Sequence, residues 1–243
     1  MNKKNFIYLF LLIFFLALLG WAVKITRAYN CANPAALPEK NIPVEHIGEK
    51  IVYDVYAGWF HLGTSTYTRL PNVAMDGKEV AQATFETKIK GFYDLEKIYS
   101  DRDTLLPLKV MREIEGWGLK EKITEEYNQK DLTISFTKFT GSKTEQSSIK
   151  TKGPIHNAVL LPFYIRKVAN PQVGWSILAF IPQQFEIKLV AEEELKIPSG
   201  TFKAYFFKSV PDNFEIWVSA DERRVPLKIK SSGSTMVMKE YKL

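Results

Sequence analysis

Cysteine and histidine are scarce in this sequence of 243 residues. It holds one cysteine, Cys31, and three histidines, His46, His61 and His156. A single cysteine cannot form an intrachain disulfide or a multi-cysteine metal site. No two histidines stand three or four residues apart, which is the spacing of a helical metal site. We therefore predict neither a bound metal nor a cofactor.

Recognisable catalytic motifs are also missing. The sequence contains no G-x-S-x-G turn, no P-loop and no glycine-rich dinucleotide motif. Its best catalytic candidates are Asp101 and Asp103, which would share one face of a strand about 7 Å apart, within the range that glycoside hydrolysis requires. Arg102 would then face the other way, and acidic pairs on exposed strands are common. We therefore predict that the protein is not an enzyme, and keep a carboxylate-dependent hydrolase as the third alternative.

Neither sign of charge dominates the greater part of the chain. The formal charge is +6, from 33 lysines and arginines and 27 aspartates and glutamates. Residues 1–28 hold Lys3, Lys4, Lys24 and Arg27 and no acidic residue, so the remainder carries a charge of +2. A domain so close to neutral lacks the basic surface that nucleic-acid binding needs. We predict no nucleic-acid partner.

The N-terminus carries the one long apolar run. Phe6 to Val23 is apolar over 18 residues and follows a short basic start. This pattern is typical of an export signal, but the run is also just long enough to span a bilayer. We interpret 1–28 as a signal peptide or membrane anchor and the proline-containing segment 29–47 as a linker. The protein is then exported, to the periplasm or the periplasmic face of the inner membrane, with the inner membrane as its partner through this segment.

From residue 48 to 243 the pattern indicates one β domain. Apolar and polar residues alternate, as in Ile51, Tyr53 and Val55, and turn residues such as Asp76-Gly77 separate the runs. The mixed polarity of 119–128 suggests an edge strand. Helical spacing occurs once, near 155–168. We predict an all-β fold with one short helix: a long antiparallel meander forming an open or closed barrel-like sheet, preceded by an N-terminal hydrophobic helix. Further strands are predicted at 79–90, 94–103, 108–116, 131–139, 143–150, 175–182, 184–196, 202–210, 214–219, 225–231 and 234–242.

Several segments of this domain carry a family resemblance. They are Gly48-Glu49-Lys50-Ile51-Val52-Tyr53-Asp54-Val55, Leu161-Pro162-Phe163-Tyr164-Ile165-Arg166, Ile197-Pro198-Ser199-Gly200-Thr201-Phe202-Lys203-Ala204, Glu215-Ile216-Trp217-Val218-Ser219 and Asp221-Glu222-Arg223-Arg224-Val225-Pro226-Leu227. Together they resemble domain-of-unknown-function family 3108. The resemblance implies an exported envelope protein of β architecture and offers no catalytic residues. More distantly, the pattern is similar to the β half-barrels of lipoprotein carriers, which helices close over.

The aromatic residues allow two interpretations. They can line a lipophilic cavity, or they can fill the core of a β domain. For the first, we predict ligand contacts from Phe163, Tyr164, Arg166 and Trp217, although Arg166 can instead pair with a carboxylate of the sheet. The leading hypothesis is therefore a non-enzymatic envelope protein that binds an apolar ligand such as a lipid. The alternative is a structural or protein-interaction module that presents a strand edge.

Overall fold

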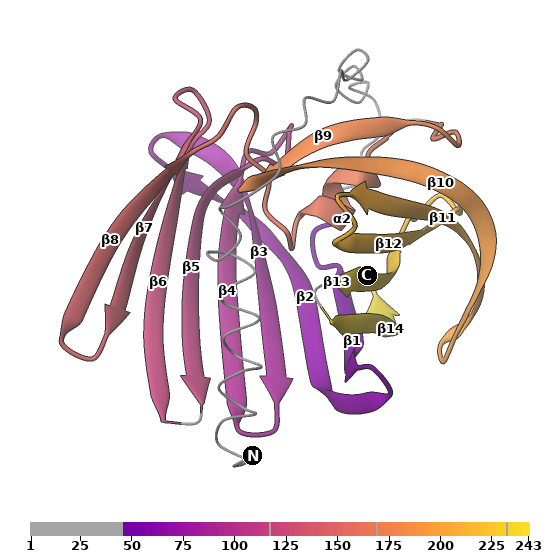
Figure 1. Ribbon diagram of the computed structural model, residues 1–243, viewed down its shortest axis with the longest axis horizontal. Helices are drawn as coiled ribbons and strands as arrows, with labels where there is room; N and C mark the ends of the chain where they lie inside the picture. The colour runs from indigo at the N-terminus through magenta and orange to yellow at the C-terminus, as the bar shows by residue number, and fades with distance from the viewer. Residues whose placement is uncertain (1–45, 117, 169, 232) are drawn as a thin grey trace.

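The computed structural model describes residues 46–116, 118–168, 170–231 and 233–243 (Figure 1). The predicted signal or anchor at 1–28, and all but the last two residues of the predicted linker, lie outside this part. Within the described residues, no helix has the length and apolar character needed to cross a membrane.

A single sheet of fourteen antiparallel strands makes up the fold. The chain runs through β1 to β8 as one meander and through β9 to β14 as a second, and β14 pairs with β1 to join them. We call β1–β8 the first wing and β9–β14 the second wing. The two outer strands, β8 and β9, do not pair with each other, so the sheet is not closed. The prediction of an all-β meander with one short helix is confirmed, and of its two forms the open one is observed.

The first wing is a broad curved sheet, and the second wing bends more sharply beside it (Figure 1). At the tip of the β10–β11 hairpin, the hydroxyl of Ser199 donates to the carbonyl of Met238 in β14 at 2.9 Å, so this hairpin folds back over its own wing. The strands of the first wing are β1 (Lys50–Ala57), β2 (Phe60–Met75), β3 (Lys78–Ile89), β4 (Phe92–Ser100), β5 (Pro107–Gly116), β6 (Leu119–Asn128), β7 (Thr133–Thr140) and β8 (Lys143–Lys150). Those of the second wing are β9 (Ser176–Ile181), β10 (Gln183–Ile197), β11 (Gly200–Val210), β12 (Phe214–Ser219), β13 (Pro226–Ser231) and β14 (Ser234–Lys242).

Local sequence accounts for most of these strands. In β1, Ile51, Tyr53 and Val55 are buried and alternate with more exposed residues, which is the period of two expected of a strand with one core face. Asp76 and Gly77 both have positive φ, at 51° and 76°, and join β2 to β3. This is the turn geometry that an Asp-Gly pair favours in a hairpin.

The prediction of an edge strand at 119–128 is wrong. Strand β6 pairs with β5 on one side and β7 on the other. Its polar residues are tolerated inside the sheet because they find partners across it: Glu121, for example, pairs with Lys138 of β7 at 2.7 Å. The edge of the first wing is β8.

The helix, α2 (Leu161–Ile165), is shorter than the predicted range and holds the two wings together. Leu160 and Phe163 pack into a core to which both wings contribute, β1 to β5 from the first wing and β10 to β14 from the second. Leu161 and Ile165 pack into a second core, formed by strands of the second wing. Both sides of this five-residue helix are therefore buried, and it lies between the wings (Figure 1).

Candidate functional site

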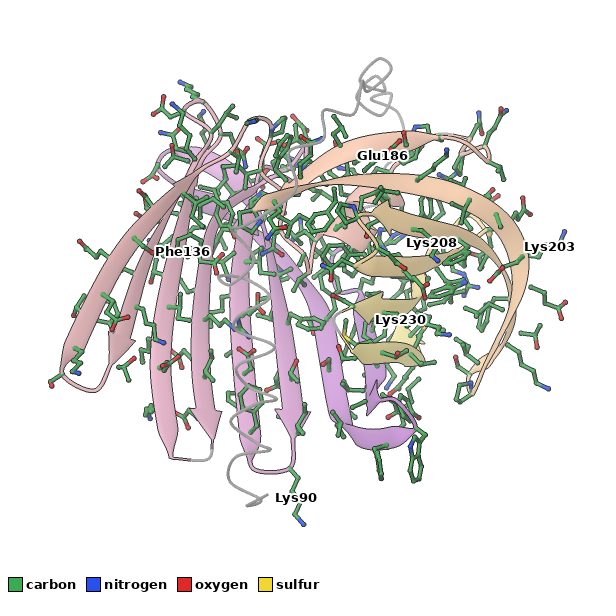
Figure 2. The ribbon with its side chains drawn as sticks, in the orientation of Figure 1. Lys90, Phe136, Glu186, Lys203, Lys208 and Lys230 are labelled. Carbon is green, nitrogen blue, oxygen red and sulfur yellow. The ribbon has the colours of Figure 1, made fainter. Side chains whose placement is uncertain are left out.

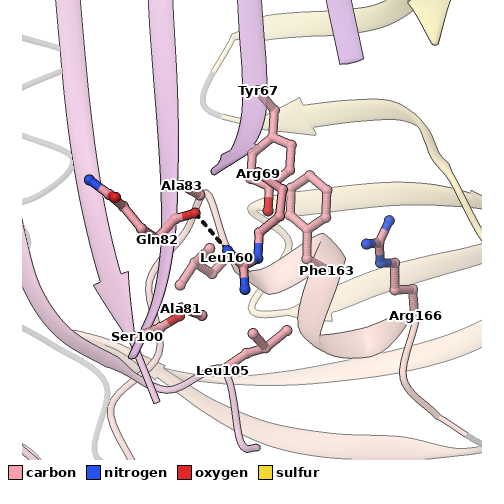
Figure 3. A pocket seen from close by; sticks show the side chains of 10 residues that line it. All are labelled: Tyr67, Arg69, Ala81, Gln82, Ala83, Ser100, Leu105, Leu160, Phe163 and Arg166. Atoms are coloured by element: carbon pink, nitrogen blue, oxygen red, sulfur yellow. Dashed lines mark hydrogen bonds between the residues drawn. The ribbon is translucent and has the colours of Figure 1, made fainter. Parts of the chain in front are cut away.

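The predicted ligand site at α2 is closely packed. The ring of Phe163 stacks on Tyr67 of β2, with 3.8 Å between the ring centroids. The space beside them is a cavity of about 10 Å³, also lined by Leu160, Leu105 and Arg69 (Figure 3). That volume holds about one water molecule. Here Phe163 fills the core rather than lining a ligand pocket.

Arg166 forms a buried ion pair. Its Nη1 and Nη2 donate to Oε1 and Oε2 of Glu49, each at 2.8 Å, and both residues are almost completely buried. Burial alone would lower the pKa of Arg166, but the hydrogen bonds and charge of Glu49 raise it overall. The guanidinium also lies 5.0 Å from the ring centroid of Phe163. The alternative prediction, that Arg166 pairs with a carboxylate, is confirmed, since Glu49 directly precedes β1.

The two other predicted site residues lie apart from this cavity. Tyr164 is half-buried and meets the ring of His156 edge-on, with centroids 4.9 Å apart. Trp217, on β12, stacks on Phe206 at 4.4 Å and donates its indole N–H to Oε1 of Glu193 at 2.8 Å. The structure therefore brings Phe163 and Arg166 together at the cavity. Trp217 belongs to the same apolar core as Phe163 but does not line the cavity.

The carboxylate pair proposed for hydrolysis does not form as predicted. Strand β4 ends at Ser100, so Asp101 and Asp103 lie in a turn rather than on one face of a strand. Oδ1 of Asp101 accepts hydrogen bonds from the backbone N–H of Asp103 at 3.1 Å and of Thr104 at 2.8 Å, and from the Thr104 hydroxyl. Burial would raise the pKa of Asp101, but the bonds from Thr104 lower it overall. Its carboxylate closes the turn.

A polar group that sequence reasoning missed lies on the inner face of the first wing. Asp94 and Glu96 of β4, Arg112 of β5, and Glu125 and Tyr127 of β6 form what we call the inner-wall cluster. Glu96 faces Arg112 across the ladder and stands two residues before Ile98, so it shares the face of Ile98. That isoleucine belongs to the same core as Phe163. The cluster therefore continues the core-facing surface of the wing.

Arg112 is the centre of the inner-wall cluster. Its Nε donates to the two carboxylate oxygens of Asp94 at 2.8 and 3.0 Å, and its Nη2 also donates to Asp94. Glu96 Oε1 lies 3.7 Å from the same Nε. The Tyr127 hydroxyl donates to Glu125. The charge of Glu125 also acts on Arg112, so three carboxyl groups surround one guanidinium whose side chain is largely shielded from water.

This arrangement shifts the acidity of its members. Burial raises the pKa of Glu96 to about 7, which Arg112 opposes and Asp94 and Glu125 reinforce. Burial also raises the pKa of Glu125, against the hydrogen bond from Tyr127 and the charge of Arg112. Glu96 therefore exists in both protonation states near neutral pH and can either donate or accept a hydrogen bond. Strongly perturbed carboxyl groups of this kind occur often at functional sites.

Apolar side chains border the inner-wall cluster. Across the ladders, Ile114 faces Asp94, Ile123 faces Arg112 and Phe136 of β7 faces Glu125. Residues directly opposite in antiparallel strands share a face, so these side chains lie on the same wall. The signal in the sequence is faint, because it consists of charged residues spread over three strands whose register is visible only after folding. No three His, Cys, Asp or Glu residues in the described part of the chain are arranged to hold a metal ion.

Comparisons with known proteins identify a family, and one solved structure has a similar fold. A family model described as protein of unknown function (DUF3108) matches residues 52–238. No curated protein matches the sequence. Among solved structures, a β-barrel-like protein of the DUF1849 family from Brucella abortus is similar, with a TM-score of 0.50 and 8% identity, covering 80% of this chain and 97% of that one. A protein with a YmcC-like fold from Bacteroides fragilis gives a TM-score of 0.29 at 9% identity, covering 82% and 97%.

Proposed function

The chain belongs to the DUF3108 family, whose function is unknown, and we propose that it is a non-enzymatic binding protein of the cell envelope. Its ligand is an amphipathic molecule such as a lipid, held against the inner face of the first wing. One observation carries this proposal: the inner-wall cluster places buried ionic groups beside apolar side chains on an open sheet.

Mixed chemistry on one wall suits a ligand with a polar group and an apolar body. Ligand sites combine apolar lining with a few placed polar groups. Arg112 and Glu96 supply the polar groups, and Ile123 and Phe136 supply the apolar neighbours. A ligand head group that bonds to Glu96 or Glu125 would compensate for the burial of their charge.

The helix is the weaker place for such a ligand. Pockets for small molecules measure roughly 300–1,000 Å³, whereas the cavity beside Phe163 measures about 10 Å³. A lipid could enter there only if α2 left its position between the wings. We therefore assign α2 the structural role of fixing the wings relative to each other.

A binding role also fits the carboxylates better than hydrolysis. A glycosidase needs one protonated carboxyl group and a second carboxylate that is free to act as base or nucleophile. Glu96 meets the first requirement. Asp94, however, is held by Arg112, and Glu125 accepts a hydrogen bond from Tyr127. Neither partner is poised for the second task.

Envelope location rests on the N-terminal sequence. The apolar run from Phe6 to Val23 after a basic start is the pattern of an exported chain. Residues 1–47 fused to a reporter that is active only outside the cytoplasm should give activity. A well-expressed but inactive fusion would contradict export.

Mass spectrometry of co-purifying lipids tests the ligand. The full chain is purified from membranes in mild detergent, beside an unrelated domain fused to residues 1–47 as the control for lipid bound by the apolar run. The parent should carry a lipid species that the control lacks. Phe136→Ala, at the position labelled in Figure 2, should lose it, whereas Ser135→Ala, on the opposite face of β7, should keep it. A parent with no lipid beyond the control would overturn the proposal.

A second candidate is a protein-interaction module, favoured by the edge strand β8. None of its eight side chains is buried, and it pairs on one side only, with β7. An extended segment of a partner can add a strand to such an edge. A photo-reactive amino acid in place of Gln146 should then trap a protein in cells. The same group in place of Phe136 should trap lipid if the leading proposal holds.

A further inference from the structure

We propose that one end of the first wing rests on the surface of a lipid membrane. In an antiparallel meander, alternate turns lie at the same end of the sheet. The turns between β1 and β2, β3 and β4, β5 and β6, and β7 and β8 therefore meet along one border, at the lower edge of Figure 1. We call this border, with the strand ends beside it, the rim.

Exposed aromatic side chains stand near both ends of the rim. Trp59, in the β1–β2 turn, is 83% exposed, and Phe60, which begins β2, is 57% exposed. Their rings lie against each other with centroids 4.0 Å apart. Phe139, one residue before the end of β7, is 44% exposed. Within the described part of the chain, the exposed large apolar residues elsewhere are all aliphatic or methionine.

These rings do not serve the core. A hairpin tip can be made from small polar residues, and Gly58 already supplies the positive φ of 59° that the turn needs. Placing Trp59 and Phe60 in water instead leaves a large apolar surface unburied. Aromatic rings of this kind are enriched where proteins meet the interface between lipid and water, because that region accepts both apolar and polar atoms.

Exposed lysines stand at two of the turns of the rim. Lys90 extends outward from the β3–β4 turn, as Figure 2 shows, and Lys143 begins β8, where it is exposed. Three more lysines near the rim pair with glutamates: Lys88 with Glu86, Lys120 with Glu115 and Lys122 with Glu113. Lys138 and the acidic residues Asp54, Asp94, Glu121 and Glu145 lie at the same depth, so the charges beside the strand ends nearly balance. Lys90 and Lys143 stand at the turns themselves, where exposed cations favour a surface of anionic lipid.

The length of the chain permits this contact. If the apolar run to Val23 is retained in the membrane, residues 24–47 connect it to the domain. Fully extended, 24 residues reach about 80 Å, whereas β1 with its eight residues spans about 27 Å. The domain can therefore turn the rim toward the same membrane that holds its N-terminus. The proposal is independent of the ligand of the inner-wall cluster.

Fluorescence quenching by brominated lipid tests the contact. The full chain is reconstituted into vesicles of phosphatidylcholine and phosphatidylglycerol whose acyl chains carry bromine, which quenches tryptophan only on contact. Trp59→Phe is compared with Trp175→Phe, because Trp175 is half-buried against Phe207. Trp21, in the apolar run, contributes equally to all three proteins. The quenched component should be smaller in W59F than in the parent, and unchanged in W175F.

Two further measurements separate the possible outcomes. Lys90→Glu combined with Lys143→Glu should reduce the quenching of Trp59 in vesicles that contain phosphatidylglycerol. Unchanged quenching would show that these lysines do not contribute to membrane binding. Equal quenching in the parent and W59F would overturn the membrane contact itself. A dimer in detergent solution that Trp59→Ser dissociates would also overturn it, by showing that a second copy of the chain covers the rim.

Discussion

Glu49 and Arg166 stand 117 positions apart in the chain and meet in a two-pronged ion pair with both N–O distances at 2.8 Å. The pair joins the residue before β1 to the end of α2, so it ties the start of the first wing to the segment that crosses between the wings. Because both members are buried, the loss of either one leaves an uncompensated charge inside the protein.

Removing one member of this pair should be strongly destabilising. Glu49→Ala leaves the guanidinium of Arg166 buried without its counter-charge, and breaking a buried pair in this way costs about 3–5 kcal/mol. The double variant Glu49→Leu with Arg166→Met removes both charges and should recover much of that loss. The free energy of unfolding in urea measures both effects. A double variant no more stable than E49A would contradict this account.

Truncation of Phe163 tests whether the helix packs tightly. Its ring stacks on Tyr67 and borders a cavity of about 10 Å³, so little space exists for the surroundings to rearrange. Phe163→Ala should lower the free energy of unfolding by about 3–5 kcal/mol. Val173→Ala, at an exposed position before β9, serves as the control and should have little effect. A small loss for F163A, together with binding of an apolar fluorescent probe by the parent, would instead indicate a ligand cavity.

The sequence pattern predicted the strands well where turn residues mark their ends. The ranges 143–150, 214–219 and 234–242 agree with β8, β12 and β14. It overestimated the helix, since only Leu161–Ile165 is helical and the preceding residues reach their place through tertiary contacts instead. One such contact is the hydrogen bond from the backbone N–H of His156 to the carbonyl of Phe180, at 2.9 Å.

The candidate site is formed by contacts between distant parts of the chain, which a local sequence pattern does not reveal. Phe163 and Arg166 lie together in the predicted helix, and the sequence therefore predicts them as site residues. Whether a cavity surrounds them depends on how the helix packs against β1 and β2, which the local sequence does not show. Glu96 and Arg112 were missed because their pairing requires the register of β4 against β5. Alternation predicts which face a residue occupies, but not which charged residue lies opposite.

His156 should make the protein less stable in acid. It is buried in the segment that crosses to the second wing, and its Nδ1 accepts a hydrogen bond from the backbone N–H of Phe180 at 3.4 Å. Burial lowers its pKa from 6.5 to about 4, with Pro154 opposing in part. The unfolded chain therefore binds a proton more readily, and stability is lost as the pH falls from about 6.5 toward 4, by up to roughly 3 kcal/mol.

Urea unfolding across this range should show the loss in the parent and not in His156→Asn, which keeps an acceptor. An equal loss in both proteins would assign it to other groups.

Glu96 should make the protein less stable as the pH rises, which is the opposite of the effect expected for His156. Burial raises its pKa from 4.5 to about 7 in the folded protein, against the attraction of Arg112. Between these values the folded state keeps a proton that the unfolded chain releases. Stability therefore falls as the pH rises from about 4.5 to 7, by at most roughly 3 kcal/mol, and levels off above pH 7.

Glu96→Gln keeps the shape and a hydrogen-bond donor but cannot ionise, so its stability should not fall over this range, and it should exceed that of the parent at pH 8. Asp54→Asn is the matched control, since Asp54 is a carboxylate of β1 that pairs with Lys239 outside the cluster. An E96Q variant with the pH dependence of the parent would show that Glu96 ionises freely in the fold. Glu96 would then be ionised at neutral pH and could only accept hydrogen bonds from a ligand.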